Sequence, residues 1–102
     1  MQAIIEARRA ALAQLCRRFH VRRLEVFGSA TTDRFDPSRS DVDLLVEFDP
    51  DTPLSPFDAY FGFKEAAEEL LGLPVDLLME AAVRNPYLRA SIERTKEPLY
   101  AA

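Results

Sequence analysis

Near the middle of this chain of 102 residues lies Ser40-Asp41-Val42-Asp43-Leu44-Leu45-Val46-Glu47-Phe48, the clearest strand pattern in the sequence. Residues 41–48 are expected to form a strand, because the even-numbered positions are apolar and share one face. Asp41 and Asp43 point to the other face, about 7 Å apart, which is twice the rise per residue. Two carboxylates at this spacing can share a cation, since a divalent metal relieves their mutual repulsion.

A candidate phosphate-binding turn precedes this strand. Residues 22–27 read as an earlier strand that leads directly into Gly28 and Ser29. Glycine lets a ligand approach the backbone closely, and serine can add a hydroxyl donor to the amide donors of the turn. A Gly-Ser pair after a strand is most often an ordinary turn. Residues 30–40 are rich in Asp, Ser and Thr, which favour a loop after at most a short helical turn.

A third acidic residue lies later in the chain. Residues 75–78 predict a short apolar strand that Asp76 interrupts. A carboxylate buried there would cost several kcal/mol without a partner, so Asp76 is expected to face a positive group. If this strand lies beside residues 41–48, three carboxylates converge, which suits a site for two metal ions. Glu80 is the alternative third acid.

Three helices complete the predicted elements. Apolar residues recur at helical spacing over residues 3–19 and 56–71, and a last helix is expected over residues 86–95. Ser55-Pro56 and Asn85-Pro86 are typical of helix starts. The aromatic residues Phe57, Tyr60 and Phe61 recur along one helix, which predicts that they mostly belong to the core. Residues 98–100 form either an edge strand or a tail. The predicted order is helix, strand, strand, helix, strand, helix.

Composition narrows the class of protein. The net charge of -4 argues against general nucleic-acid binding, which usually needs a basic excess. The arginines near the N-terminus predict a solvated helix face, the alternative being a face for an acidic partner or a phosphate. Cys16 is the only cysteine, which excludes an internal disulfide and a zinc cluster. No apolar run is long enough to span a membrane, and we expect a cytoplasmic location.

In combination, these motifs resemble those of the minimal nucleotidyltransferases, small members of the DNA polymerase β-like superfamily. The resemblance covers about residues 24–78. Its landmarks are Phe27-Gly28-Ser29, Ser40-Asp41-Val42-Asp43-Leu44-Leu45-Val46 and Pro74-Val75-Asp76-Leu77. It implies an α+β nucleotidyltransferase fold, in which a small mixed sheet of three to four strands is flanked by helices. We expect residues 1–102 to form one such domain.

The resemblance also implies the chemistry. A nucleoside monophosphate would pass from ATP to an acceptor hydroxyl, and pyrophosphate would leave. The catalytic residues, which would also hold two Mg²⁺ ions, would be Asp41, Asp43 and Asp76. The nucleotide-binding residues would be Gly28, Ser29, Arg39 and Ser40.

Two features depart from the family pattern. Eleven residues, 30–40, separate the serine of the turn from the first aspartate, where ten are usual. The basic residue that commonly follows Gly-Ser is absent, which leaves Arg34 or Arg39 to contact the triphosphate.

The resemblance further implies a partner. Larger members of the superfamily carry a helical domain for which this chain is too short, so another molecule must present the acceptor. In minimal nucleotidyltransferases this is typically a HEPN-domain toxin, which the enzyme neutralises as an antitoxin by adenylylating it. Two alternatives stay open: a binding-only antitoxin or adaptor, and an enzyme that modifies RNA or a small molecule. A homo-oligomer or a hetero-oligomer is compatible with each of them.

Overall fold

Four strands form one mixed sheet in the computed structural model, which describes residues 2–32, 35, 36, 38 and 40–102. Strand β1 (Val21–Phe27) pairs antiparallel with β2 (Val42–Phe48) on one side and with β4 (Glu97–Ala101) on the other. Strand β3 (Val75–Met79) runs parallel to β2, which gives the order β3-β2-β1-β4. The α+β architecture with a mixed sheet flanked by helices is confirmed, and residues 98–100 belong to a fourth strand.

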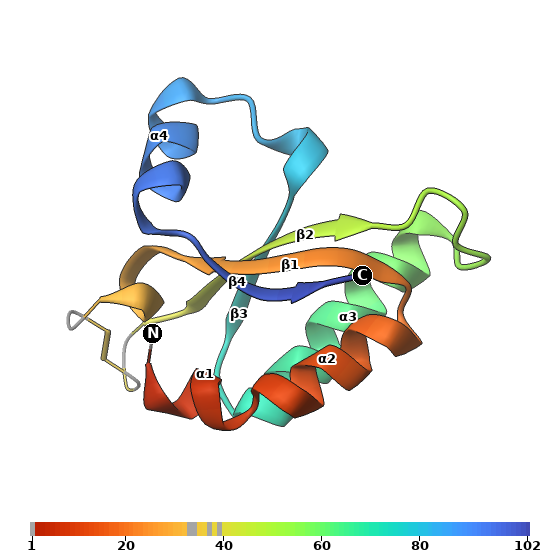
Figure 1. Ribbon diagram of the computed structural model, residues 1–102, viewed down its shortest axis with the longest axis horizontal. Coiled ribbons are helices and arrows are strands. Elements are labelled where there is room, and N and C mark those ends of the chain that lie inside the picture. The colour runs from red at the N-terminus through yellow and green to blue at the C-terminus, as the bar shows by residue number, and fades with distance from the viewer. Residues whose placement is uncertain (1, 33–34, 37, 39) are drawn as a thin grey trace.

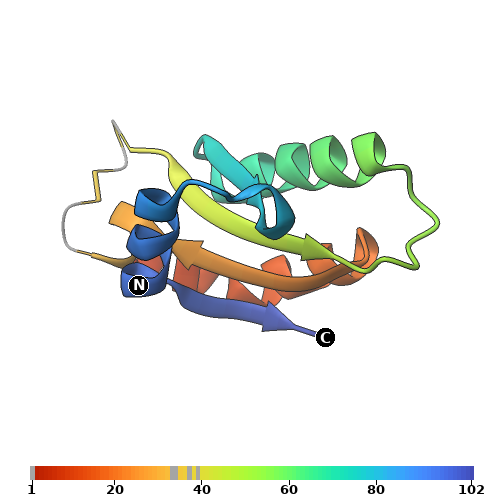
Figure 2. The same ribbon diagram turned by 90° about the horizontal axis from the view of Figure 1, so that it is seen from above.

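Helices cover both faces of the sheet. Helices α1 (Ala3–Ala7), α2 (Arg9–Arg18) and α3 (Pro56–Leu71) lie on one face, and α4 (Pro86–Thr95) lies on the other (Figure 1). Seen from above, α4 sits over the end of the sheet where β1 ends and β2 begins (Figure 2). The short helical turns η1 (Gly28–Thr31) and η2 (Glu80–Ala82) follow β1 and β3. Elements distant in sequence therefore meet at one end of the sheet.

Alternation along β2 divides the core between the two faces. Val42, Leu44 and Val46 are buried against α1, α2 and α3, whereas Leu45 is buried on the opposite face. On that opposite face, Leu45 belongs to a smaller cluster with the buried side chains of Phe27, Val83 and Ile92. Helix α4 packs on the sheet through this smaller cluster, since Ile92 is the buried residue of that helix.

Two predictions about the helices are wrong. The helix expected over residues 3–19 is interrupted at Arg8, whose backbone leaves the helical region, and its second part ends at Arg18. Phe57 and Phe61 are 69% and 48% exposed and contact each other with their rings tilted by 41° and the ring centroids 4.7 Å apart. They lie on the outer side of α3, because Phe63 and its neighbours one turn away occupy the side that faces the sheet.

The free edge of β3 is covered by side chains from α3. The Tyr60 hydroxyl donates to the carbonyl of Leu77 at 2.6 Å, and Glu68 Oε2 accepts from the amide of Val75 at 2.9 Å. Unpaired backbone groups on an edge strand are a template for another strand. These two bonds therefore protect the edge of the strand that carries Asp76.

The N-terminus of α4 is capped by Asn85, whose Oδ1 accepts from the amides of Tyr87 at 2.8 Å and Leu88 at 3.3 Å. Asn85→Ala should lower the free energy of unfolding by about 1 kcal/mol, because both amides lose their acceptor. Asn85→Asp keeps a carboxylate oxygen in place and should retain most of that stability. Urea unfolding measures both variants, and an Asn85→Ala protein as stable as wild type would contradict the capping role.

Within the described residues, no helix is both long and apolar enough to cross a lipid bilayer.

Candidate active site

Asp43 and Asp76 lie side by side on adjacent strands. Strands β2 and β3 pair in parallel register, and Asp43 is matched directly with Asp76. Residues in register on neighbouring strands point to the same face and are separated by about 4.8 Å of strand spacing. Asp41 precedes β2 by one residue and is exposed. The chain thus places three acidic side chains at one end of the sheet.

Asp76 does not meet the expectation of a buried carboxylate that faces a positive group. Its side chain is exposed, since β3 is an edge strand, and its neighbour across the sheet is another acid. None of the three carboxylates forms an ion pair with the rest of the described chain. Unpaired acids at this density are unfavourable, which is typical of a functional site.

The crowded environment raises the pKa of Asp43. Burial raises it most, followed by the negative charges of Asp76 and Asp41, and together they move the pKa from 3.8 to about 6. Near neutral pH, Asp43 is therefore a carboxylate held in an unfavourable environment. A cation bound at this position would relieve both the burial and the repulsion.

Gly28 lies directly against Asp43. Its φ of 71° is in the left-handed region, and a Cβ built on it would come within 2.5 Å of Asp43 Oδ2. Only glycine combines this backbone conformation with this close approach at low cost. The turn after β1 and the acidic strand β2 consequently lie in direct contact and can belong to one candidate site.

The donors of this turn are divided between two tasks. The Gly28 amide donates to Thr95 Oγ1 at 2.9 Å, at the end of α4, so it is already engaged. The amide and the hydroxyl of Ser29 donate to no other described residue. Ser29 therefore keeps two donors for a ligand, while Gly28 contributes space. Thr95 carries no recognisable motif, and sequence reasoning missed it.

The loop before β2 holds the remaining candidates. Ser40 lies next to Asp41, where its amide donates to the carbonyl of Asp36 at 2.7 Å and its Oγ accepts from the Asp36 amide at 3.2 Å. These bonds close the loop that leads into the acidic strand. Arg34 and Arg39 lie outside the described residues, so their proposed contacts with the triphosphate stay predictions.

Glu80, the alternative third acid, is engaged elsewhere. Its Oε1 accepts from Arg89 Nη1 at 3.0 Å, and Arg89 also donates to the carbonyls of Glu80 and Val83. These contacts join η2 to α4. Asp76, in register with Asp43, is therefore the better third acid.

The residues present suit a Mg²⁺ ion in their chemistry. Carboxylate oxygens are the protein ligands that this hard cation prefers, and Asp43 gains from a positive neighbour. In the part of the chain that the structure describes, no three acidic, histidine or cysteine side chains lie close enough together to hold a metal ion by themselves. Asp43 and Asp76 are matched in register and Asp41 is exposed two residues before Asp43, so a bound triphosphate would have to supply further ligands to any metal ion held here.

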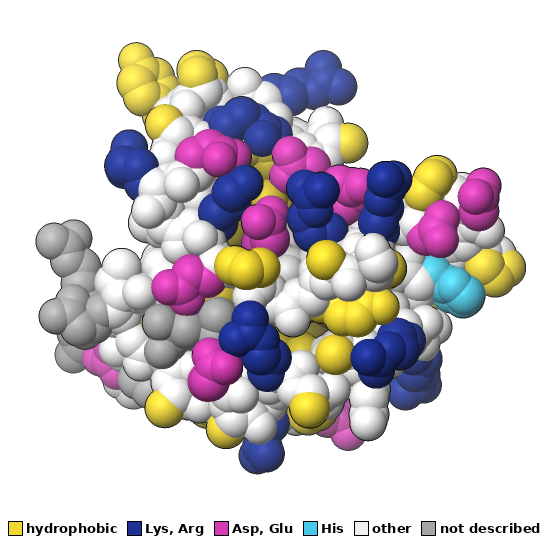
Figure 3. All heavy atoms as spheres, in the orientation of Figure 1, with side chains coloured by type: hydrophobic (Ala, Val, Ile, Leu, Met, Phe, Trp, Pro, Cys, Tyr) yellow, Lys and Arg dark blue, Asp and Glu magenta, His cyan; other side chains and the backbone are white. Residues whose placement is uncertain are grey.

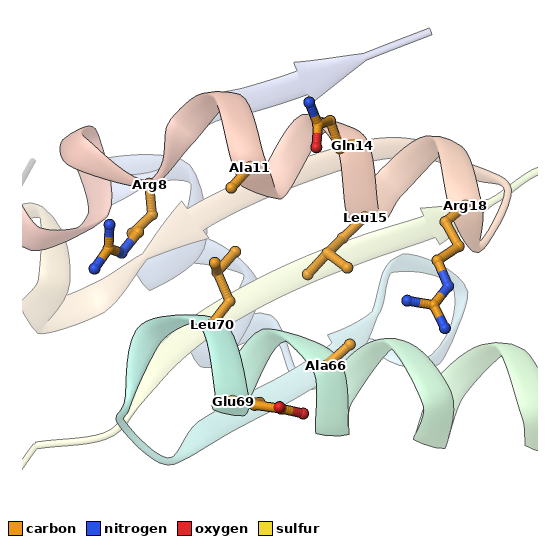
Figure 4. Close-up of a pocket in the computed structure, with 8 residues that line it drawn as sticks. All are labelled: Arg8, Ala11, Gln14, Leu15, Arg18, Ala66, Glu69 and Leu70. Atoms are coloured by element: carbon orange, nitrogen blue, oxygen red, sulfur yellow. The ribbon is translucent and has the colours of Figure 1, made fainter.

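A pocket of about 580 Å³ lies between α2 and α3, away from these acids. Figure 4 shows Leu15 and Leu70 inside it and the side chains of Arg8 and Arg18 near its two ends. It is on the face of the sheet opposite Asp43, so it is not part of the acidic site. Arg8 and Arg18 are exposed, as expected of a solvated helix face.

On the face seen in Figure 3, acidic and basic side chains are interspersed.

Comparison with known sequences places the chain among enzymes. The family model for the nucleotidyltransferase domain matches residues 8–98. Two proteins of Methanocaldococcus jannaschii, named after an inferred protein adenylyltransferase activity, are 36% and 37% identical to this chain over 76 residues. Each alignment covers 74% of this chain and 74% of the relative.

Comparison with solved structures agrees with the fold. The structure of a protein assigned as a minimal nucleotidyltransferase is 36% identical and has a TM-score of 0.75, with 93% of this chain and 92% of that one covered. A toxin-antitoxin complex with AMP-PNP has a TM-score of 0.70 at 18% identity, covering 92% of this chain and 73% of that one. A Shewanella oneidensis complex of a tri-AMPylated HEPN toxin with its MNT antitoxin has a TM-score of 0.65 at 16% identity, covering 95% and 72%. The last two show the fold alone.

Proposed function

The chain belongs to the nucleotidyltransferase domain family, and we propose that it transfers AMP from ATP to a hydroxyl group of a partner protein. The observation that carries this proposal is the contact between Gly28 and Asp43, where an added Cβ would meet Asp43 Oδ2 at 2.5 Å. It joins a turn with free donors to a cluster of unpaired acids. A triphosphate and its metal need both, since one supplies hydrogen bonds and the other supplies ligands.

The residues divide the work by position. Asp41 and Asp43 would hold the metal ions, together with Asp76 on the edge strand. Mg²⁺ held there would supply positive charge to offset the negative charge of the triphosphate. Ser29 donates to the β- and γ-phosphates through its amide and hydroxyl, and Gly28 provides the room for them. Ser40 and Arg39 complete the nucleotide contacts.

The reaction is an in-line substitution at the α-phosphorus. The acceptor oxygen forms the new bond to phosphorus, and the bond from the α-phosphorus to the bridging oxygen breaks, so that pyrophosphate leaves. Asp76 helps to take the hydroxyl proton, because its exposed carboxylate is open to an acceptor that approaches the edge of the sheet. Positioning and charge neutralisation supply most of the catalysis in this chemistry.

A protein acceptor is supported by the relatives. The Methanocaldococcus jannaschii proteins are named for protein adenylylation, and the Shewanella oneidensis complex pairs an AMPylated HEPN toxin with an MNT antitoxin. We propose the same arrangement here: a HEPN-domain toxin as acceptor, and this chain as its antitoxin in the cytoplasm. The hetero-oligomer formed with the toxin is then the working assembly.

The test is transfer of label from ATP labelled at the α-phosphate, with Mg²⁺, to the protein encoded by the neighbouring reading frame. Covalent label on that protein, found on one or more hydroxyl side chains by mass spectrometry, is the expected result. Label on RNA or on a small molecule would replace the proposed acceptor. A stable complex without any label would favour the binding-only antitoxin instead.

A further inference from the structure

Thr95 joins the end of α4 to the turn that receives the triphosphate. Its Oγ1 accepts from the Gly28 amide at 2.9 Å, across 67 residues of sequence, and donates to the carbonyl of Ser91 at 2.9 Å within α4. A threonine hydroxyl has one hydrogen and two acceptor lone pairs. Because its hydrogen is directed to Ser91, an oxygen lone pair is left facing Gly28, and the direction of the bond is set by the helix.

The end of α4 is anchored on both sides of this bond. One turn earlier, Ile92 is fully buried in the cluster that includes Phe27, the residue before Gly28. One residue later, Lys96 Nζ lies 3.8 Å from Oε2 of Glu25, a buried carboxylate of β1. Thr95 is therefore held by packing and by charge at a fixed place relative to the end of β1.

The Gly28 backbone depends on such an anchor. Its left-handed conformation is accessible to glycine but not enforced by it, because glycine populates many conformations with similar energy. Among the described residues, a backbone bond also ties η1 to the N-terminal segment, from the Gln2 amide to the carbonyl of Ala30 at 3.1 Å. That bond holds the far side of the turn, whereas Thr95 holds the residue that faces Asp43.

We infer that Thr95 is a positioning residue for nucleotidyl transfer: it fixes the Gly28 amide so that the donors of Ser29 and the carboxylate of Asp43 keep one relative geometry. The inference rests on the proposed function, because it assigns the turn to the triphosphate. Thr95 acts through Gly28 and has no part in the chemistry itself. Its hydroxyl is the feature that matters, and its methyl group serves packing.

Thr95→Val separates the hydroxyl from the shape of the side chain, since valine is similar in size and also branched. We expect the KM for ATP to rise about tenfold, which corresponds to the loss of one hydrogen bond that orders the site. Thr95→Ser restores the hydroxyl and should return KM to within about threefold of wild type. Asn85→Ala is the matched control, because it destabilises the same helix from its other end and should leave KM within about twofold.

Two further measurements do not depend on turnover. In hydrogen exchange, the Gly28 amide should be protected in wild type and Thr95→Ser and should exchange much faster in Thr95→Val. Binding of a non-hydrolysable ATP analogue with Mg²⁺ should weaken in parallel with the rise in KM. Unchanged KM and nucleotide affinity in Thr95→Val, with wild type active, would overturn the inference. A wild-type protein that neither binds nor turns over ATP would instead overturn the proposed function.

Discussion

Replacing Asp43 by asparagine is expected to abolish nucleotidyl transfer and, at the same time, to stabilise the metal-free protein near neutral pH. Transfer should fall by about 10³-fold or more, because a lost metal ligand removes several kcal/mol of transition-state stabilisation. The fold should be kept, since asparagine has the same shape and Asp43 makes no ion pair with other described residues. Activity with α-labelled ATP and urea unfolding measure the two effects.

The gain in stability depends on pH. Burial, Asp76 and Asp41 raise the pKa of Asp43 from 3.8 to about 6, so the folded state binds this proton more tightly than the unfolded state. The stabilising contribution is therefore fully present below about pH 4 and is lost as the pH rises through about 6. Asparagine resembles the protonated form at every pH. The variant should match wild type near about pH 4 and exceed it by on the order of 1 kcal/mol at about pH 8, after allowance for solvent screening.

Asp51→Asn is the matched control for this experiment. It makes the same change in net charge at an exposed residue in the turn after β2, at the other end of that strand. It should transfer AMP at the wild-type rate and gain no comparable stability. Added Mg²⁺ should raise the melting temperature of wild type and Asp51→Asn but not of Asp43→Asn. An Asp43→Asn protein that keeps wild-type turnover would remove Asp43 from the active site.

Gly28→Ala should have the second large effect, through geometry rather than charge. The left-handed backbone at φ 71° costs an alanine about 1–2 kcal/mol, and its Cβ would also collide with Asp43 Oδ2. Either the turn or the carboxylate must move. We expect a loss of stability of about 2–3 kcal/mol and a loss of transfer of about 10²-fold or more, since small displacements of reacting groups are costly.

Gly72→Ala measures the cost of the backbone strain without the collision. Gly72 ends α3 at φ 69°, and a Cβ built there meets nothing within 4 Å. Gly72→Ala should lower the free energy of unfolding only by the cost of an alanine in the left-handed conformation, and it should leave transfer intact. In an Asp43→Ala background, where the colliding oxygen is absent, Gly28→Ala should cost no more stability than Gly72→Ala. A Gly28→Ala protein that keeps wild-type transfer would contradict the role of the close contact between Gly28 and Asp43.

Much of the sheet could be predicted because alternation is a local signal. The pattern of residues 41–48 defines which side chains share a face, and the structure buries Val42, Leu44 and Val46 together. The helix starts at Ser55 and Asn85 could be predicted for the same reason, since capping uses side chains within three residues. The break at Arg8 could not, because no proline or glycine marks it.

Burial was harder to predict, because it depends on where an element lies in the fold. Asp76 stands among apolar residues in sequence, but β3 is an edge strand and the carboxylate is exposed. Phe57 and Phe61 match the helical period of α3 but fall on its outer side. Periodicity shows which residues share a face, and it does not show whether another element covers that face.

Only part of the candidate site could be predicted from the sequence. The acids and the Gly28-Ser29 turn could be found because each forms a short motif. Thr95 could not, because its contact with Gly28 joins residues 67 apart and nothing in the sequence around it resembles a motif. The hydrogen bond from the Gly28 amide identifies Thr95, and only the folded structure contains it.

Parallel reactions with ATP labelled at either the α- or the γ-phosphate show whether this site transfers the nucleotide part of ATP. With wild-type protein, Mg²⁺ and the neighbouring gene product, the α-label should become covalently attached to that protein, and the γ-label should appear in pyrophosphate. Attachment of the γ-label would show a kinase reaction, and release of the γ-label as free phosphate would show hydrolysis. Either of these results, or no reaction of either label, would contradict nucleotidyl transfer by this site.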